Sequence, residues 1–324
     1  MSVVVRTPDE RFADLPGYPW APRYVEIDDD IGTMRMHYVD AGPPDADPVL
    51  LLHGQPTWSY LYRSVIADLA ERGHRAIAPD YIGYGRSDKV TDRFAYTLES
   101  HIRWVAAFVR TLDIQRATAV VQDWGGPIGF GLLGAEGDRF ARVVAADTVL
   151  HTCEPWLGGV LTWANYATDT SRVMIEEALL DWMLTTQRER DLSPGAIVQS
   201  ITARELTRRE VAAYDAPFPD ELHRVGLRHM NTLIPVTRTS PSAAVCRTSF
   251  DTLRRWNRPF LTVWGEDDPG TSGWETVFQQ HVPGAAGQAH RILAGAGHFI
   301  QEDAGPEFAG IISDFIAAPA PETG

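Results

Sequence analysis

Short apolar runs alternate with helical patterns along the first half of the chain. Four runs each end just before a polar residue: Val49–Leu52 before His53, Ala76–Ala78 before Asp80, Ala119–Val121 before Asp123, and Val143–Ala146 before Asp147. Apolar residues at helical spacing fill the intervals, for instance in Leu98–Leu112. Continuously apolar strands that alternate with helices predict a parallel sheet covered by helices on both faces. Chemistry in such folds collects at the carboxyl ends of the strands.

The flanking segments extend this pattern. Tyr24–Ile27 and Met34–Val39 alternate apolar and polar residues and predict an antiparallel hairpin before the first parallel strand. Phe260–Trp264 and His290–Leu293 predict two further strands, and Phe308–Ala317 predicts a last helix.

The strand signals stop near residue 150. Helical spacing recurs in Ser171–Leu184 and Pro194–Thr207, without strand runs of comparable quality. We therefore expect residues 1–150 and 231–324 to form one α/β core. Residues 151–230 should form an all-helical cap domain inserted over the sheet.

The composition limits the classes of function. Of the 324 residues, 44% are hydrophobic and 22% are charged, which is typical of a globular protein. A formal net charge of −14 disfavours nucleic acid as a partner, because phosphate binding needs clustered cations. The two cysteines, Cys153 and Cys246, cannot form a disulfide framework. With no visible signal peptide and no apolar stretch of about 20 residues, we expect a cytoplasmic protein without a membrane partner.

Asp123 stands where a strand gives way to the small residues of Trp124-Gly125-Gly126. A strand, a sharp turn and a small-residue helix start are typical of a nucleophile elbow. Gly125 has the usual place two residues after the nucleophile, but Val121 replaces the usual glycine two residues before it. An aspartate tolerates the left-handed backbone of such a turn, and the helix N-terminus stabilises its carboxylate. On these residues alone, Asp123 could equally be a helix N-cap.

Other polar loops follow predicted strands. His53-Gly54-Gln55-Pro56 follows the Val49–Leu52 run, where a backbone N–H can complete an oxyanion hole. His298 follows the last strand behind three small residues. The chain order nucleophile, acid, histidine is that of the α/β-hydrolase fold. Three acids, Glu266, Asp267 and Asp268, compete after Phe260–Trp264, and the G-x-x-D pattern of the fold selects Asp268.

Together these motifs resemble the haloalkane dehalogenases. The matching segments are His53–Arg63, Ala78–Asp80, Gly83–Lys89, Gln122–Gly126 and Gly297–Glu302, and the similarity runs from Thr7 to the last helix. The tryptophan directly after the aspartate makes the combination selective. The resemblance is strongest to the first subfamily and implies an α/β-hydrolase fold with a cap.

The resemblance implies a two-step hydrolysis with a catalytic triad and no metal or organic cofactor. Asp123 would displace halide from the substrate carbon and form an alkyl ester. His298, oriented by Asp268, would then activate the water that hydrolyses the ester. Backbone N–H groups of Gln55 and Trp124 would hold the oxyanion. The expected partners are a small halogenated alkane and a chloride or bromide product, in a monomeric enzyme.

Halide binding needs N–H donors that cannot accept a hydrogen bond, and indole meets that need. The resemblance assigns Trp124 and the cap residue Trp182, in preference to Trp156 and Trp163. The Gln55 side chain, which replaces the usual Glu or Asn, is expected to contact halide or water. The alternative is that it only fixes its loop.

Three alternatives remain open. Asp147 stands where the second subfamily places its acid, so it is an alternative triad acid. An epoxide hydrolase would use the same machinery with cap tyrosines such as Tyr166 or Tyr214. A catalytically silent relative would keep only a pocket for a small ligand.

Overall fold

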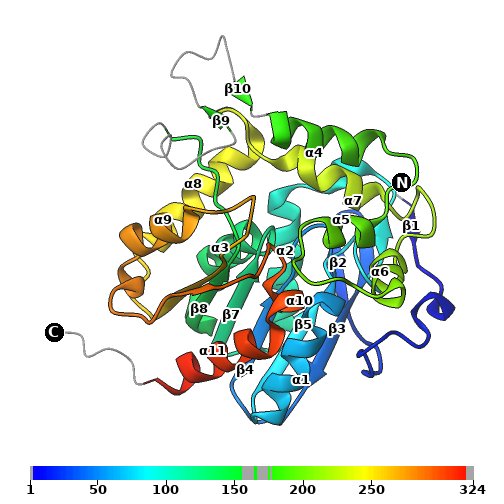
Figure 1. Ribbon diagram of the computed structural model, residues 1–324. Coiled ribbons are helices and arrows are strands. Elements are labelled where there is room, and N and C mark those ends of the chain that lie inside the picture. Colours follow the sequence, from blue (N-terminus) through cyan, green and yellow to red (C-terminus); the bar gives the residue numbers. More distant parts are fainter. Residues whose placement is uncertain (1–2, 155–163, 166–173, 176, 319–324) are drawn as a thin grey trace.

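A single eight-stranded sheet forms the centre of the computed structural model, which describes residues 3–154, 164–165, 174–175 and 177–318 (Figure 1). Its strand order is β12-β11-β8-β7-β4-β5-β3-β2. The strands are β2 (Arg23–Asp29), β3 (Gly32–Ala41), β4 (Pro48–Leu52), β5 (Arg75–Pro79), β7 (Ala117–Gln122), β8 (Phe140–Ala146), β11 (Phe260–Gly265) and β12 (Arg291–Leu293). Six strands, β4, β5, β7, β8, β11 and β12, pair in parallel, while β2 and β3 add as an antiparallel hairpin. The predicted hairpin and parallel sheet are confirmed.

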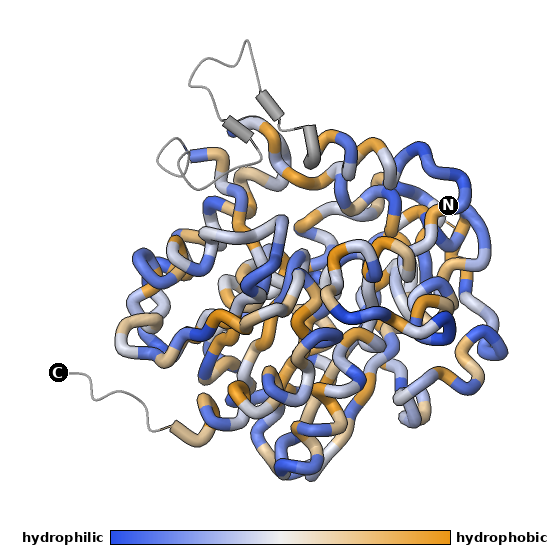
Figure 2. Tube along the Cα trace, viewed as in Figure 1, coloured by the Kyte–Doolittle hydropathy of each residue, from blue (hydrophilic) through white to orange (hydrophobic). Residues whose placement is uncertain are grey.

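Helices cover both faces of this sheet. They are α1 (Arg63–Glu71), α2 (Leu98–Thr111), α3 (Gly125–Glu136), α8 (Pro241–Leu253), α9 (Trp274–His281), α10 (Ile300–Asp303) and α11 (Gly305–Ala317). Alternate residues of β4 enter two separate cores: Leu50 and Leu52 pack in one, and Val49 and Leu51 in the other. Burial on both faces explains why the strands are continuously apolar, and the hydrophobic colour concentrates in them (Figure 2). No helix in the described ranges is long and apolar enough to cross a bilayer.

The inserted segment, residues 151–230, contains both helices and strands. Its described elements are β9 (Ala164–Asn165), β10 (Met174–Ile175), α4 (Glu177–Arg188), α5 (Pro194–Ser200), α6 (Arg208–Asp215) and α7 (Val225–Met230). The prediction of an exclusively helical segment is wrong, because β9 and β10 pair antiparallel. The expected helix over Ser171–Leu184 begins only at Glu177 in the described residues.

The second helix expected in this segment, over Pro194–Thr207, is also divided. Helix α5 ends at Ser200, and Thr207 starts a new helix as the N-cap of α6. The Thr207 hydroxyl accepts from the N–H of Glu210, whose side chain accepts from Thr207 in return. This capping box fixes the start of α6. Trp156, Trp163 and Tyr166 lie outside the described residues.

His101 of α2 is buried among aromatic rings. The ring centroids of Tyr81, Tyr96 and Trp104 lie 5.9, 5.9 and 5.2 Å from its own. Within the described chain neither ring nitrogen of His101 has a hydrogen-bond partner. Burial lowers the pKa of His101 from 6.5 to about 3. The folded protein therefore holds this imidazole neutral, whereas the unfolded chain protonates it below its ordinary pKa.

Acid should destabilise the protein partly through this residue. Stability from a neutral His101 is complete above pH 6.5 and falls as the pH drops toward the folded-state pKa of about 3. The loss approaches about 1.4 kcal/mol per pH unit. His101→Phe should flatten the dependence of the unfolding free energy on pH, measured by urea denaturation between pH 6.5 and 4. His74→Phe, at a half-buried histidine, is the control and should change the slope less. An unchanged slope in His101→Phe would contradict this account.

Candidate active site

Asp123 occupies a left-handed turn between β7 and α3. Its φ is 51°, a region that aspartate tolerates better than most residues. Its N–H donates to the Asp147 carbonyl at 3.0 Å, and its own carbonyl accepts from Gly126 N at 2.9 Å and Thr148 Oγ1 at 2.6 Å. These bonds fix the backbone and leave the side chain at the carboxyl edge of the sheet. The elbow geometry expected from the sequence is present.

The loop after β4 lies directly against the Asp123 carboxylate. The backbone N–H of Gln55 donates to Asp123 Oδ1 over 2.6 Å. Gly54 permits this approach, because a Cβ at that position would lie 2.4 Å from Asp123 Oδ1. The backbone of Trp124, the second expected oxyanion donor, follows in the same turn as the N-cap residue of α3. The two segments with expected oxyanion donors therefore meet at the same carboxylate.

The Gln55 side chain already has protein partners. Its Nε2 donates to the Leu227 carbonyl of α7 at 2.9 Å, and its Oε1 accepts from the Tyr84 hydroxyl at 2.9 Å. Gln55 also lines the cavity described below. Both ends of the amide are used, which supports the alternative that Gln55 fixes its loop. One amide hydrogen remains for the predicted contact with halide or water.

His298 connects the aspartate to a second carboxylate. Its Nδ1 lies 3.1 Å from Asp268 Oδ1, and its Nε2 lies 3.6 Å from Asp123 Oδ2. Burial alone would lower the pKa of His298, but Asp268 and Asp123 raise it well above the ordinary value. Burial also opposes ionisation of Asp268, yet His298 and the hydrogen bonds from Thr271 and Gly270 lower the pKa of Asp268. The three side chains therefore form a charge-coupled array, in which His298 is hydrogen-bonded to Asp268 and pairs with Asp123 at a longer distance.

The structure distinguishes among the competing acids. Glu266 and Asp267 are exposed, whereas Asp268 is buried. Asp147 is buried too, but its Oδ1 accepts from Gly265 N at 2.8 Å and not from the histidine. Within the described residues its Oδ2 has no hydrogen-bond partner. Burial, and next the charge of Asp268, raise the pKa of Asp147 well above its ordinary value. The geometry favours Asp268 as the partner of the histidine.

Gln122 was not singled out by the sequence, although it contacts the histidine. It ends β7, and its Nε2 lies 3.2 Å from both Nε2 and the carbonyl oxygen of His298. An amide NH₂ can only donate, so this contact favours an unprotonated Nε2, the form that a general base needs. The carboxylates of Asp123 and Asp268 oppose it by favouring the protonated ring. The only feature of the sequence that could have pointed to Gln122 is its position directly before Asp123.

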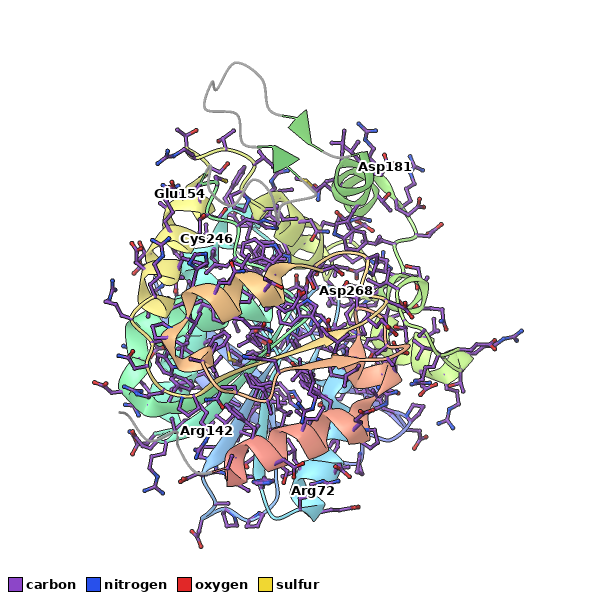
Figure 3. All side chains as sticks on the ribbon, turned by 60° about the vertical axis from the view of Figure 1, so that its left-hand side comes forward. Arg72, Arg142, Glu154, Asp181, Cys246 and Asp268 are labelled. Carbon is purple, nitrogen blue, oxygen red and sulfur yellow. The ribbon has the colours of Figure 1, made fainter. Side chains whose placement is uncertain are left out.

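A cavity of about 500 Å³ separates the core from the inserted segment. Asp123, Asp268 and His298 line one side, and its other walls are mostly apolar. The apolar lining residues include Pro127, Val149, Ile197, Ile201 and Ile234. Two of the lining residues, Asp268 after β11 and Cys246 on α8, are labelled in Figure 3. The cavity can therefore hold a small apolar molecule next to the Asp123 carboxylate.

Trp124 at the elbow and Trp182 on helix α4 both line this cavity. Neither indole N–H donates to a protein group in the described part of the chain. By contrast, Trp58 Nε1 donates to the Ala213 carbonyl at 3.2 Å, and Trp104 Nε1 donates to Asp29 Oδ2 at 2.8 Å. The two cavity indoles thus keep a donor available for an anion. Trp156 and Trp163 lie outside the described residues.

Tyr214 does not lie at the cavity. It is fully buried, and its hydroxyl donates to Glu302. Among the described lining residues no tyrosine occurs. The proton donor that an epoxide hydrolase needs is therefore not supplied by Tyr214, and Tyr166 lies outside the described residues. This observation weighs against the epoxide alternative.

Known proteins are similar to this chain over nearly its whole length. The family model for the alpha/beta hydrolase fold matches residues 47–187. The haloalkane dehalogenase of Psychrobacter cryohalolentis is 41% identical over 314 residues, which cover 97% of this chain and 98% of that protein. That of Mycobacterium marinum is 43% identical over 307 residues, covering 94% and 97%. The tetrameric haloalkane dehalogenase of Paraglaciecola agarilytica NO2 is 27% identical, with a TM-score of 0.84 and coverage of 98% and 99%.

This similarity agrees with the site. The expected nucleophile, histidine and acid meet at the carboxyl edge of one sheet, beside two indoles in an apolar cavity. The resemblance inferred from the motifs is confirmed, and so is the predicted fold class. The chain belongs to the haloalkane dehalogenases, enzymes of the α/β-hydrolase fold.

Proposed function

We propose that this enzyme hydrolyses halogenated alkanes to an alcohol and a halide through an ester on Asp123. The observation that carries the proposal is the pair of indoles, Trp124 and Trp182, which share an apolar cavity with Asp123 and whose N–H groups donate to no protein group among the described residues. A departing halide needs such donors, because the mostly apolar walls of the cavity offer few other groups to stabilise it. Residues 151–230 would act as the cap that supplies Trp182 and closes the cavity.

In the first step, the Asp123 carboxylate attacks the halogen-bearing carbon. A carbon–oxygen bond forms as the carbon–halogen bond breaks, and the halide leaves with the bonding electrons. The indole N–H groups of Trp124 and Trp182 stabilise the leaving halide. Asp123 is then neutral as an alkyl ester, so it no longer favours a protonated His298.

In the second step, water attacks the carbonyl carbon of the ester. His298 Nε2 takes the proton, while Asp268 orients the ring and balances its new charge. The backbone N–H groups of Gln55 and Trp124 stabilise the oxyanion. When this tetrahedral intermediate collapses, the bond between the carbonyl carbon and the oxygen that carries the alkyl group breaks. His298 donates its proton to that oxygen, and the alcohol leaves. Asp123 is left as a carboxylic acid, and loss of its proton regenerates the carboxylate. The sum is one haloalkane and one water converted to alcohol, halide and a proton.

A direct assay distinguishes the enzyme classes. Purified enzyme should release bromide from 1,2-dibromoethane or 1-bromobutane and form no diol from a simple epoxide. Diol formation without halide release would favour an epoxide hydrolase. Neither product from the folded protein, over a range of chain lengths, would favour a silent binding relative.

Trp182→Phe should weaken halide binding without unfolding the protein. Losing one of two donors to a partly desolvated anion should cost about 1.5–3 kcal/mol, or roughly ten-fold or more in Kd. Bromide quenching of tryptophan fluorescence measures this affinity. Trp20→Phe, at a partly exposed tryptophan outside the described cavity lining, is the control. Unchanged affinity in Trp182→Phe would move the donor role to Trp156 or Trp163.

We also propose that the enzyme is a cytoplasmic monomer. The net charge of −14 favours mutual repulsion of the chains, and two cysteines are compatible with a reducing compartment. The Paraglaciecola agarilytica relative is a tetramer. Light scattering after size-exclusion chromatography would therefore decide between one and four copies of the 35.9 kDa chain.

A further inference from the structure

The backbone of the catalytic histidine loop is held by the inserted segment. The N–H of His298 donates to the Ile201 carbonyl, at the end of α5, over 3.1 Å. A Cβ at Gly297 would lie 2.5 Å from the same carbonyl, so this contact requires a glycine there. Both His298 and Ile201 line the cavity. In Figure 1, α10, the short helix that follows the histidine loop, is drawn below α5.

One carboxylate fastens the two segments together. Asp303 Oδ2 accepts from Gly297 N at 2.8 Å and from Ala203 N at 3.0 Å. Its Oδ1 accepts from Arg204 N at 2.8 Å. Asp303 thus satisfies one backbone donor of the histidine loop and two donors of residues 201–204, which we call the strap. Charge-assisted bonds to backbone N–H groups are strong, so this junction should be rigid.

The strap is anchored in turn by partly buried ion pairs. Arg204 Nε donates to the Glu302 carbonyl at 2.8 Å, and its guanidinium also contacts the Glu302 carboxylate. Arg63 of the core pairs with Glu302 at 2.5 Å and with Glu210 of α6 at 2.9 Å. Arg204 pairs with Glu210 too, at 2.8 Å. Arg63, Glu302 and Glu210 are each at least partly buried, which favours a fixed arrangement.

We propose that Asp303 is a positioning residue that, through the strap, sets the His298 backbone for the ester-hydrolysis step. This inference rests on the proposed two-step mechanism. Only the second step needs His298 Nε2 at a defined place, since the first step is an attack by Asp123 itself. A displacement of about 1 Å at a reacting group can cost about 10²-fold in rate. Loosening the junction should therefore slow hydrolysis of the ester much more than its formation.

The test compares both steps in Asp303→Ala. With 1,2-dibromoethane, rapid-quench measurements of bromide and of the alkylated enzyme give the two rates separately. Ester hydrolysis should fall about ten-fold or more while ester formation stays within about two-fold. Asp303→Asn keeps one carbonyl oxygen for Gly297 and Ala203, so it should recover much of the hydrolysis rate. If Asp303→Ala fails to fold, Asp303→Ser provides the same comparison.

Asp215→Ala is the matched control. Asp215 is half-buried like Asp303, but it belongs to the inserted segment and accepts from Ser193 Oγ and Gly195 N inside that segment. Its loss should leave the ratio of the two rates unchanged. Equal slowing of both steps in a folded Asp303 variant, or no change in either, would overturn the inference. Absence of any ester in the wild-type enzyme would instead overturn the proposed function, and the inference with it.

Discussion

His298→Phe should stop the enzyme after a single cycle and leave Asp123 alkylated. Phe fills a similar volume but has no nitrogen to take a proton from water. Loss of a general base costs about 10²–10⁴-fold, and this loss should fall on the hydrolysis step alone. With saturating 1,2-dibromoethane, about one equivalent of bromide should appear in a burst. Mass spectrometry of the digested protein should then find the bromoethyl group on the Asp123 peptide.

The histidine of a surface loop provides the control. His74 is half-buried and forms a hydrogen bond with Ser313 on α11. Neither residue is among the described residues that line the cavity. His74→Phe should turn over normally, with little ester at steady state. If His298→Phe is folded and saturated with substrate yet Asp123 stays unmodified, the two-step mechanism is wrong. A bromide burst with the bromoethyl group on another residue would show that Asp123 is not the nucleophile.

The sheet could be predicted because its strands are buried on both faces. Such strands need apolar residues at every position, so Val49–Leu52 and Val143–Ala146 are visible in the sequence without any knowledge of their neighbours. Parallel pairing then brings the residues after each strand to one edge. For this reason Asp123 and His298 could be placed together although 174 residues lie between them in the sequence.

The inserted segment could not be predicted to the same extent, because contacts distant in sequence determine where its helices end. Helix α5 ends at Ser200, and the next residues turn to bind Asp303, about 100 positions away. The same limit applies to single side chains. Gln55 is bonded to Leu227 by an interaction across 172 positions, and no local pattern marks such a pair.

Asp268 and Asp147 were both possible acids from the sequence, and the structure gives them different environments. Asp268 Oδ1 contacts His298 Nδ1, and donors from Thr271 and Gly270 help to keep this carboxylate ionised. Asp147 is engaged with Gly265 N through one oxygen and has a raised pKa, caused first by burial and next by the charge of Asp268. In the intact enzyme, ionised Asp268 therefore suppresses the ionisation of Asp147.

Asp268→Asn should lower turnover by about 10²–10⁴-fold through slower ester hydrolysis, because an amide neither balances the imidazolium nor favours the required tautomer. The bromide burst should persist, since ester formation depends on Asp123. Removing the charge of Asp268 also removes one cause of the raised pKa of Asp147, so Asp147 should sustain part of the residual activity. Asp147→Asn alone should then have little effect on turnover. Combined with Asp268→Asn, it should abolish the residual activity. If Asp147→Asn alone costs as much as Asp268→Asn, with both proteins folded, the triad acid is Asp147.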